Sequence, residues 1–168
     1  MNYCSNCGTS VLFTPAGKWP QTCGRCQTVF YNNPKPVAIV IQPVGSSGVL
    51  LVRRGIEPKV GELCLPGGYI DHGETWQEGA VRELREETGV EVKADDLVLI
   101  SVNSSSDRSN MLICCAAPNV RAHQLEMFEP NSEVTELVVT KNPIELAFPT
   151  HTQMLAYALA RIEWGTFK

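Results

Sequence analysis

Three glutamates, Glu83, Glu86 and Glu87, fall three or four residues apart in a segment whose pattern predicts a helix. At about 100° per residue they lie within roughly 100° of arc on one face of that helix. Like charges at these spacings repel, and two of the glutamates fall in the last turn, where the helix dipole disfavours anions. A divalent cation would turn the repulsion into attraction, because Mg²⁺ prefers oxygen ligands. The spacing therefore indicates a metal site or, as the alternative, a solvated charged face paired with Arg82 and Arg85.

A glycine-rich bend and a helix must position these glutamates. The Pro-Gly-Gly bend at 66–68 can bring a main-chain oxygen close to the carboxylates, which favours the metal site over the solvated face. Thr75 is a candidate N-cap with Glu78 three residues later, the pattern of a capping box, and Gly89 is a helix-ending signal. We therefore predict a helix over 75–88, with apolar residues on one side and the three carboxylates on the other.

A second constellation of chemical interest is made of four cysteines in two Cys-x2-Cys pairs, separated by 15 residues. Each pair can place two sulfurs on one side of a tight turn, so the two pairs close a tetrahedral site typical of zinc. With all four positions filled by protein, this zinc would be structural, and its binding would be coupled to folding. Gly8 and Gly24 follow ligands at positions where we expect a positive φ. Four buried cysteines or a redox pair are the alternatives. The predicted ligands are Cys4, Cys7, Cys23 and Cys26.

Composition narrows the classes of function. A net charge of −4 argues against a large nucleic-acid interface, and Lys18 and Arg25 are the only basic residues before Lys35. No stretch approaches the roughly 20 apolar residues of a membrane-spanning helix, and the N-terminus does not resemble a secretion signal. The odd number of cysteines, seven, speaks against a disulfide framework. We expect a cytoplasmic protein with neither a membrane nor a nucleic-acid partner.

The chain divides at a linker, 31–36, whose two prolines favour extended backbone. We place a zinc ribbon at 1–33 and a main domain at 34–168. A last helix, capped by Thr150 or Thr152, is expected near the C-terminus. Apolar, β-branched stretches predict strands at 37–44, 49–53, 97–102, 111–116 and 134–140. Strands mixed with few helices, without regular alternation, indicate an α+β fold or an α/β/α sandwich.

The segment from Gly68 to Val90 resembles the Nudix box, G-x5-E-x7-R-E-U-x-E-E-x-G-U, in which U is an aliphatic residue. The resemblance extends more loosely from Val37 to the final helix. It implies an α/β/α sandwich that hydrolyses a nucleoside diphosphate linked to another moiety. Every fixed position of the box is matched: Gly68, Glu74, Arg82, Glu83, Leu84, Glu86, Glu87, Gly89 and Val90.

The resemblance also implies a role for each charged residue. Glu74 would support the metal ligands as a further carboxylate, and Arg82 would orient the glutamates by ion pairing. Pyrophosphate hydrolysis needs charge neutralisation on the phosphate oxygens and an activated water, and clustered divalent ions supply both. By the resemblance, the ligands of the catalytic Mg²⁺ or Mn²⁺ ions are Glu83, Glu86, Glu87 and the carbonyl of Gly68.

The general base is left open. Some family members use a glutamate of the box and others a carboxylate on a later loop, where this sequence has Glu133 and Glu136. Either could instead be a solvated residue at the entrance to a strand. One departure from the family is Cys64, where an aromatic residue is usual; we expect altered packing behind the loop and intact carboxylates. Cys64, with Cys114 and Cys115, is expected to be a buried small apolar residue.

Two Nudix subgroups carry a four-cysteine ribbon before the domain. The NADH pyrophosphatases, which also remove NAD caps from RNA, have Ser-Gln-Pro-Trp-Pro-Phe-Pro after the box, and nothing similar follows Val90. The subgroup that hydrolyses ADP-ribose and FAD is similar here in the linker at 31–36, the glutamates at 133 and 136, and the Leu-Ala-Phe at 146–148. We therefore predict hydrolysis of ADP-ribose or FAD with release of AMP, and keep the NADH or NAD-cap activity as the alternative.

Substrate contacts and non-enzymatic functions complete the hypotheses. Phe148, Tyr69 and Arg53 are candidates to hold adenine or flavin, with core packing or a surface ion pair as the alternative for each. A Nudix domain that only senses nucleotides would be expected to lose box carboxylates, and all are kept here. A zinc-ribbon interaction module would need a basic or apolar display surface, which the sequence does not indicate. The predicted partner is a nucleotide, and a homodimer is left open.

Overall fold

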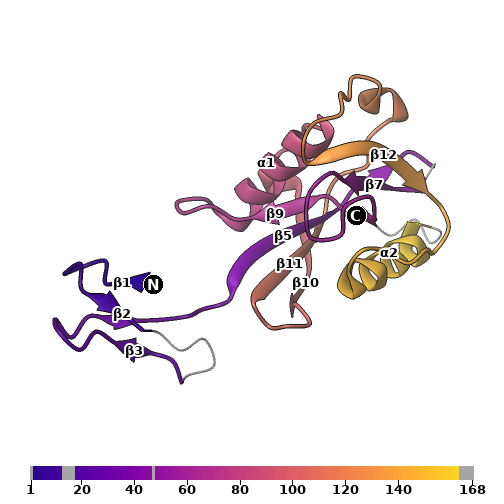
Figure 1. Ribbon diagram of the computed structural model, residues 1–168. Coiled ribbons are helices and arrows are strands. Elements are labelled where there is room, and N and C mark those ends of the chain that lie inside the picture. The colour runs from indigo at the N-terminus through magenta and orange to yellow at the C-terminus, as the bar shows by residue number, and fades with distance from the viewer. Residues whose placement is uncertain (1, 13–17, 47, 163–168) are drawn as a thin grey trace. The chain divides into compact units, whose positions relative to one another are not determined.

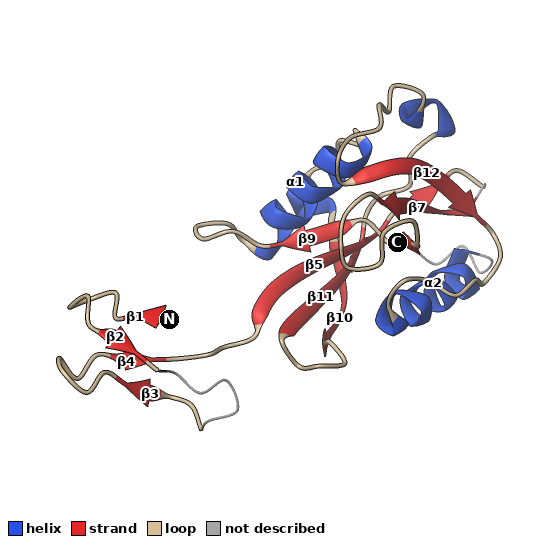
Figure 2. Ribbon diagram, in the orientation of Figure 1, coloured by secondary structure: helices blue, strands red, loops and turns tan. Residues whose placement is uncertain are grey.

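A computed structural model of the chain describes residues 2–12, 18–46 and 48–162 (Figure 1). The chain divides into two compact units, Met1–Pro34 and Lys35–Lys168, which are described separately. The first contains only short strands among its described residues, whereas the second combines longer strands with helices (Figure 2).

The N-terminal unit consists of two short hairpins with the same backbone pattern. β1 (Asn2–Tyr3) pairs with β2 (Ser10–Val11), and β3 (Gln21–Thr22) pairs with β4 (Val29–Phe30). In each hairpin the N–H of the first cysteine donates to a threonine carbonyl at 2.8 Å. The Cys4 carbonyl accepts the N–H of Gly8 at 2.9 Å, and the Cys23 carbonyl accepts the N–H of Gln27 at 3.0 Å.

The two cysteine turns place their positive backbone angles at equivalent positions. Gly8 has φ 68° and Gln27 has φ 63°. The prediction is confirmed for Gly8 and wrong for Gly24, because the chain reverses after the second cysteine of a pair and Gly24 follows the first. Tyr3 and Leu12 are largely exposed, so this unit presents more apolar surface than the sequence led us to expect.

The main domain contains two sheets. Their strands are β5 (Lys35–Ile41), β6 (Pro43–Val44), β7 (Gly48–Arg54), β8 (Leu63–Cys64), β9 (Gly67–Tyr69), β10 (Val98–Ser104), β11 (Asn110–Ala116) and β12 (Val134–Thr140). One sheet has the strand order β10-β11-β5-β9, in which β11 and β5 are parallel and the other pairs are antiparallel. The other sheet has the order β12-β7-β6, is antiparallel, and also pairs β7 with β8. The helices described are α1 (Trp76–Thr88) and α2 (Pro149–Ile162), with short 3-10 turns at Ala94–Asp96 and Ala122–Leu125.

Alternate residues of β5 contact different helices. Val40 packs in the buried cluster that contains Leu84 of α1, whereas Ile39 packs in the cluster that contains Leu155 of α2. Because successive side chains of a strand point to opposite faces, α1 and α2 cover opposite sides of the strands. The expected α+β fold with an α/β/α arrangement is confirmed.

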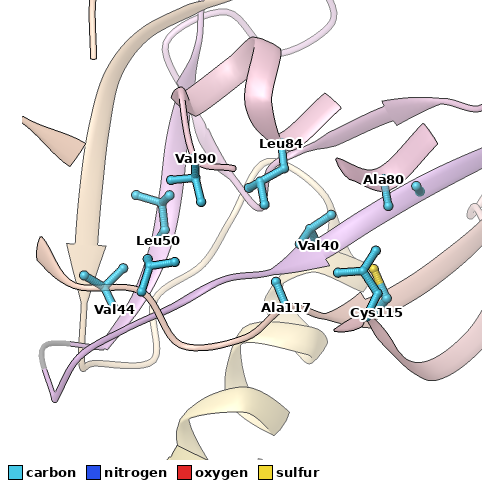
Figure 3. Packing of buried hydrophobic residues seen from close by; sticks show 11 residues of the cluster. Val40, Val44, Leu50, Ala80, Leu84, Val90, Cys115 and Ala117 are labelled. Carbon is cyan, nitrogen blue, oxygen red and sulfur yellow. The ribbon is translucent and has the colours of Figure 1, made fainter. Parts of the chain in front are cut away.

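The cluster beneath α1 joins segments that are distant in the sequence. Figure 3 shows Ala80 and Leu84 of α1 above Val40 of β5, with Leu50 of β7 and Cys115 of β11 in the same cluster. Each of these side chains is fully buried. Cys115 therefore acts as a small apolar core residue, as predicted, and the other two cysteines of this domain are also buried.

Helix α1 begins and ends where its caps predict. The Thr75 hydroxyl accepts from the Glu78 N–H at 3.2 Å, and the Glu78 carboxylate accepts from the Thr75 N–H at 2.7 Å. Both bonds of the capping box are therefore present. Gly89 has φ 72°, and its N–H donates to the Arg85 carbonyl at 2.8 Å, which ends the helix.

Two other local predictions need correction. The stretch predicted as one strand over 37–44 is interrupted at Gln42, whose buried side chain donates to the carbonyls of Pro43 and Pro118. Helix α2 begins at Pro149, a residue favoured at the first helical position, so neither proposed threonine is its cap. The Thr152 hydroxyl instead accepts the N–H of Leu146 at 3.0 Å.

The glycine-rich bend before α1 connects the two sheets. β8 pairs with β7 in one sheet, the Pro66 carbonyl accepts from the Val40 N–H at 2.9 Å, and β9 then pairs with β5 in the other sheet. The sequence predicted a bend here and missed the short strand β9. That strand runs through two glycines, and pairing with β5 overrides their weak strand preference.

Candidate active site

Arg82 of α1 binds the carboxylates of the helix and the loop that precedes it. Its Nε and Nη2 donate to the two oxygens of Glu74 at 2.7 and 2.9 Å. Its Nη1 donates to Glu83 at 2.7 Å and to Glu86 at 3.2 Å. Its Nη2 also donates to the Tyr69 carbonyl at 2.9 Å. The planar guanidinium thereby holds three carboxylates and the end of β9 in a fixed arrangement.

Glu87 lies apart from this guanidinium. Its side chain is buried, and Oε2 accepts from the Gly67 N–H at 2.8 Å. Burial raises the pKa of Glu87 to about 8, and the negative charges of Glu83 and Glu133 contribute in the same direction. The expectation that all three glutamates face away from the core is therefore wrong for Glu87, which points inward between α1 and the bend.

The other carboxylates differ in their electrostatic environments. Hydrogen bonds from Arg82 hold the pKa of Glu74 down, to about 2. Burial raises the pKa of Glu83 although Arg82 opposes the shift. Glu86 is the exposed member of the group, with 53% of its side chain accessible. Arg82 thus compensates Glu74 most fully, and the uncompensated negative charge is concentrated at Glu83 and Glu87.

Gly67 and Gly68 allow the backbone to approach these carboxylates. Gly67 has φ 144°, and a Cβ there would collide with the Ala38 carbonyl of the neighbouring strand. A Cβ on Gly68 would collide with the carboxylate of Glu83. Any larger residue at position 68 would therefore displace either the bend or Glu83.

The two candidate general bases lie in different surroundings. The negative charge of Glu133 raises the pKa of both Glu83 and Glu87, so Glu133 lies within electrostatic range of the carboxylate group. The same loop contacts α1 directly, because the Asn131 side-chain amide donates to the Glu86 carbonyl at 3.3 Å. Glu136 is instead paired with Arg53 of β7 at 2.6 Å. The geometry favours Glu133 over Glu136 as a residue of the site.

The donor set suits a hard divalent cation. All candidate side-chain ligands are carboxylates, and Gly68, whose carbonyl is the predicted main-chain ligand, lies directly against the carboxylate of Glu83. The raised pKa of Glu87 marks a buried negative charge that the nearby charge of Arg54 offsets only in part. Mg²⁺ and Mn²⁺ prefer such oxygen ligands. Glu83, Glu86, Glu87 and Gly68 therefore carry the oxygen donors that these ions prefer, while Glu74 is held by Arg82.

The four cysteines of the N-terminal unit come together. The Sγ atoms of Cys4 and Cys26 are 3.6 Å apart, and those of Cys7 and Cys23 are 3.8 Å apart. A zinc ion bound by four thiolates at about 2.3 Å has sulfur–sulfur distances of about 3.8 Å. Among the described residues, these are the group of three or more ligands whose donor atoms all lie within 4.8 Å of one another. The cluster therefore suits zinc, and none of the four is in a disulfide.

The three candidate substrate contacts have other partners. Arg53 pairs with Glu136 and also donates to the Gly61 carbonyl at 2.9 Å. Phe148 is partly buried in a small core cluster. Tyr69 is half-exposed, and the ammonium of Lys35 lies 5.3 Å from the centre of its ring. The proposed alternatives of a surface pair and of core packing fit Arg53 and Phe148, and Tyr69 retains exposed ring surface.

One polar residue near the site was missed by the sequence analysis. His151, in the first turn of α2, is buried, and its Nδ1 accepts the N–H of Leu65 at 3.1 Å. Leu65 directly precedes the bend. The two residues lie 86 positions apart, so no local pattern could have indicated the contact.

The sequence is similar to those of known proteins. The sequence matches the NUDIX domain over residues 33–147. An ADP-ribose pyrophosphatase of Methanocaldococcus jannaschii is 45% identical over 60 residues, which are 36% of this chain and 34% of that protein. An NAD-capped RNA hydrolase, NudC, of Shigella flexneri is 28% identical over 91 residues, which are 54% of this chain and 34% of that protein. These alignments thus span about a third of each curated relative.

The fold is also similar to solved structures. The crystal structure of a NUDIX hydrolase from Nitrosomonas europaea is 27% identical, with a TM-score of 0.69, and the match covers 98% of this chain and 94% of that one. The similarity therefore includes the N-terminal unit as well as the main domain. Among the described residues, no helix has the length and apolar character needed to cross a membrane.

Proposed function

Because the chain belongs to the Nudix family of pyrophosphate hydrolases, we propose that it cleaves ADP-ribose or FAD, with Mg²⁺ or Mn²⁺, and releases AMP. The observation that carries this proposal is the joint arrangement of the box residues. Arg82 binds Glu74, Glu83 and Glu86, while Glu87 is held by the N–H of Gly67. A domain that had lost hydrolysis would have no need to maintain this costly concentration of carboxylates.

Each residue would have a separate task in the reaction. Glu83, Glu86, Glu87 and the Gly68 carbonyl would hold divalent ions, which when bound neutralise the phosphate oxygens and lower the pKa of a water. Glu74 would keep Arg82 in place, and Arg82 would keep Glu83 and Glu86 aimed at the ions. We propose that Glu133 accepts the proton of the attacking water.

The bonds made and broken are the same for either substrate. The water oxygen bonds to one phosphorus of the pyrophosphate, the bond from that phosphorus to the bridging oxygen breaks, and the bridging oxygen leaves with the other phosphate. The products are AMP and ribose 5-phosphate from ADP-ribose, or AMP and FMN from FAD. The carboxylates return to their initial state once the proton is released.

The choice of substrate is supported by the relatives and by sequence features outside the box. The ADP-ribose pyrophosphatase has the higher identity, whereas the NAD-capped RNA hydrolase aligns over more residues. The linker at 31–36 and the Leu-Ala-Phe at 146–148 favour the former. Hydrolysis of NADH or of an NAD cap is therefore the second candidate.

A panel of substrates tests the proposal. The full chain would be incubated with Mg²⁺ and ADP-ribose, FAD, NADH, NAD-capped RNA or nucleoside triphosphates, and the products would be separated by chromatography. We expect AMP from ADP-ribose or FAD at the highest kcat/KM. Preferential cleavage of NADH or NAD-capped RNA would establish the second candidate instead, and cleavage of triphosphates alone would refute both.

A further inference from the structure

Backbone groups of the segment from Glu62 to Leu65 are bonded on both sides. Towards β7, the Glu62 carbonyl accepts the N–H of Arg54 at 3.0 Å. On the opposite side, the Leu63 carbonyl accepts the N–H of Ala147 at 2.8 Å, and the Leu65 N–H donates to Nδ1 of His151 at 3.1 Å. The segment that leads into α2 therefore takes the place of a neighbouring strand. For the Leu65 N–H, however, the acceptor is the imidazole of His151 and not the backbone carbonyl that a strand would supply.

The bonded segment continues directly into the candidate active site. One residue after Leu65, the Pro66 carbonyl accepts the N–H of Val40 at 2.9 Å. The next N–H, that of Gly67, donates to Glu87 at 2.8 Å, and Gly68 lies against the carboxylate of Glu83. A shift of the Leu65 backbone would therefore be transmitted through two residues to the carboxylate with the least charge compensation.

The surroundings of His151 suit it for this contact. Its imidazole is buried, and its ring lies 5.1 Å from that of Phe148 at an angle of 55°. Burial lowers the pKa of His151 to about 4, so the ring is neutral and Nδ1 has a lone pair for the Leu65 N–H. Leu65 is also buried, and its amide would lack a partner if the imidazole were removed.

We propose that His151 is a positioning residue of the active site, which fixes the bend at 66–68 through the Leu65 amide and so sets the affinity for divalent cations. The inference rests on the proposed role of the glutamates and Gly68 in metal binding. His151 itself contacts neither a carboxylate of the box nor the substrate in this scheme. Its removal should therefore weaken metal binding and turnover, with little effect on the KM for the nucleotide.

Three variants of the full chain separate positioning from general packing. His151→Leu removes the acceptor, and His151→Asn keeps an acceptor because its Oδ1 can occupy the place of Nδ1. Leu155→Ala, at a fully buried position one turn later in α2, weakens the core cluster that also contains Leu65 but keeps the imidazole acceptor for the Leu65 N–H. Mn²⁺ affinity would be measured by electron paramagnetic resonance, and kcat, KM and the Mg²⁺ dependence would be measured with the preferred substrate.

We expect His151→Leu to weaken Mn²⁺ binding and raise the half-activating Mg²⁺ concentration by about tenfold, the scale of losing a residue that supports a metal ligand. His151→Asn should stay within about threefold of the wild type on that scale, and Leu155→Ala should lose stability but keep its Mn²⁺ affinity. Wild-type Mn²⁺ affinity in a folded His151→Leu variant would overturn the proposal. Equal impairment of His151→Asn, or of Leu155→Ala, would overturn it as well.

A measurement on the wild type covers the case in which His151→Leu fails to fold. A scalar coupling between the ¹⁵N nuclei of the Leu65 amide and His151 Nδ1 would report the hydrogen bond directly, and its absence would refute the positioning contact. Failure of the substrate proposal has a different signature, because Mn²⁺ affinity would still respond to His151→Leu even if no nucleotide of the panel were hydrolysed.

Discussion

Glu87→Gln should make the metal-free protein more stable while nearly abolishing its activity. The wild-type carboxylate is buried, with one N–H donor from Gly67 and two acidic neighbours. Glutamine keeps an oxygen for the Gly67 N–H and carries no charge. It is a poorer ligand for a divalent cation, so turnover should fall by about a hundredfold or more, beyond the loss typical of residues that only support a ligand.

The size of the stability gain follows from the shifted pKa. Burial raises the pKa of Glu87 from 4.5 to about 8 in the folded chain, and each unit corresponds to about 1.36 kcal/mol. The free energy of unfolding of the wild type should therefore decline, relative to the variant, as the pH rises from 4.5 through 8. The variant should be more stable by up to about 3 kcal/mol at pH 7 and up to about 5 kcal/mol at pH 9.

Urea unfolding in buffers free of Mg²⁺ and Mn²⁺ measures this difference. A chelator should be avoided because it would also remove the zinc that we propose for the cysteine cluster. At pH 7, Mg²⁺ at 100 times its Kd should close most of this difference, because it stabilises the wild type by about 2.7 kcal/mol. Glu91→Gln, at an exposed glutamate just beyond the box, is the matched control and should change neither stability nor turnover.

Two results would contradict the reasoning. If Glu87→Gln is less stable than the wild type without metal at pH 8, the buried carboxylate does not destabilise the fold as its surroundings indicate. If Mg²⁺ stabilises the variant as much as the wild type, Glu87 is not a metal ligand. Either result with unchanged turnover would remove Glu87 from the site altogether.

Three further predictions address the bend, the cysteines and pH. Gly68→Ala should raise the half-activating Mg²⁺ concentration by about tenfold or more, because its Cβ would displace Glu83; unchanged Mg²⁺ dependence would contradict this. Cys23→Ser should reduce bound zinc, measured by metal analysis, while some hydrolysis persists; absence of zinc from the wild type would refute the site. Burial and Arg54 lower the pKa of His151 to about 4, so unfolding free energy should fall as the pH drops below 6.5, by up to about 2 kcal/mol at pH 5. His151→Asn should remove this part of the pH dependence in urea titrations.

Features fixed by local chemistry could be predicted from the sequence. The capping box at Thr75 and the helix end at Gly89 depend on residues three or four positions apart, and both are present. The Cys-x2-Cys spacing places two sulfurs on one turn, and the four sulfurs come together. The strand at 134–140 is confirmed to the residue because its β-branched pattern is bounded by clear breaks.

Features fixed by tertiary contacts could not be predicted. A helical projection gives the angle of Glu87 around the helix axis. It does not show that the bend at 66–68 packs over the Glu87 side chain, so the burial of Glu87 was missed. The positive φ at Gln27 follows from the hairpin geometry alone, and because the residue is not a glycine the sequence gives no signal for it. The contact of His151 with Leu65 joins segments that only the packing of α2 brings together.

The distribution of charge explains why the site needs ions in addition to its arginine. Arg82 faces Glu74, Glu83 and Glu86, and it gives two hydrogen bonds to Glu74, whose pKa they hold down to about 2. For Glu87 the charge of Arg54 offsets burial only in part, so without a cation the carboxylate lowers its energy by retaining a proton. A protonated Glu87 is a poor ligand, so cation binding and proton release from Glu87 must be coupled. Metal affinity should consequently rise with pH up to about 8, with a slope that Glu87→Gln would abolish.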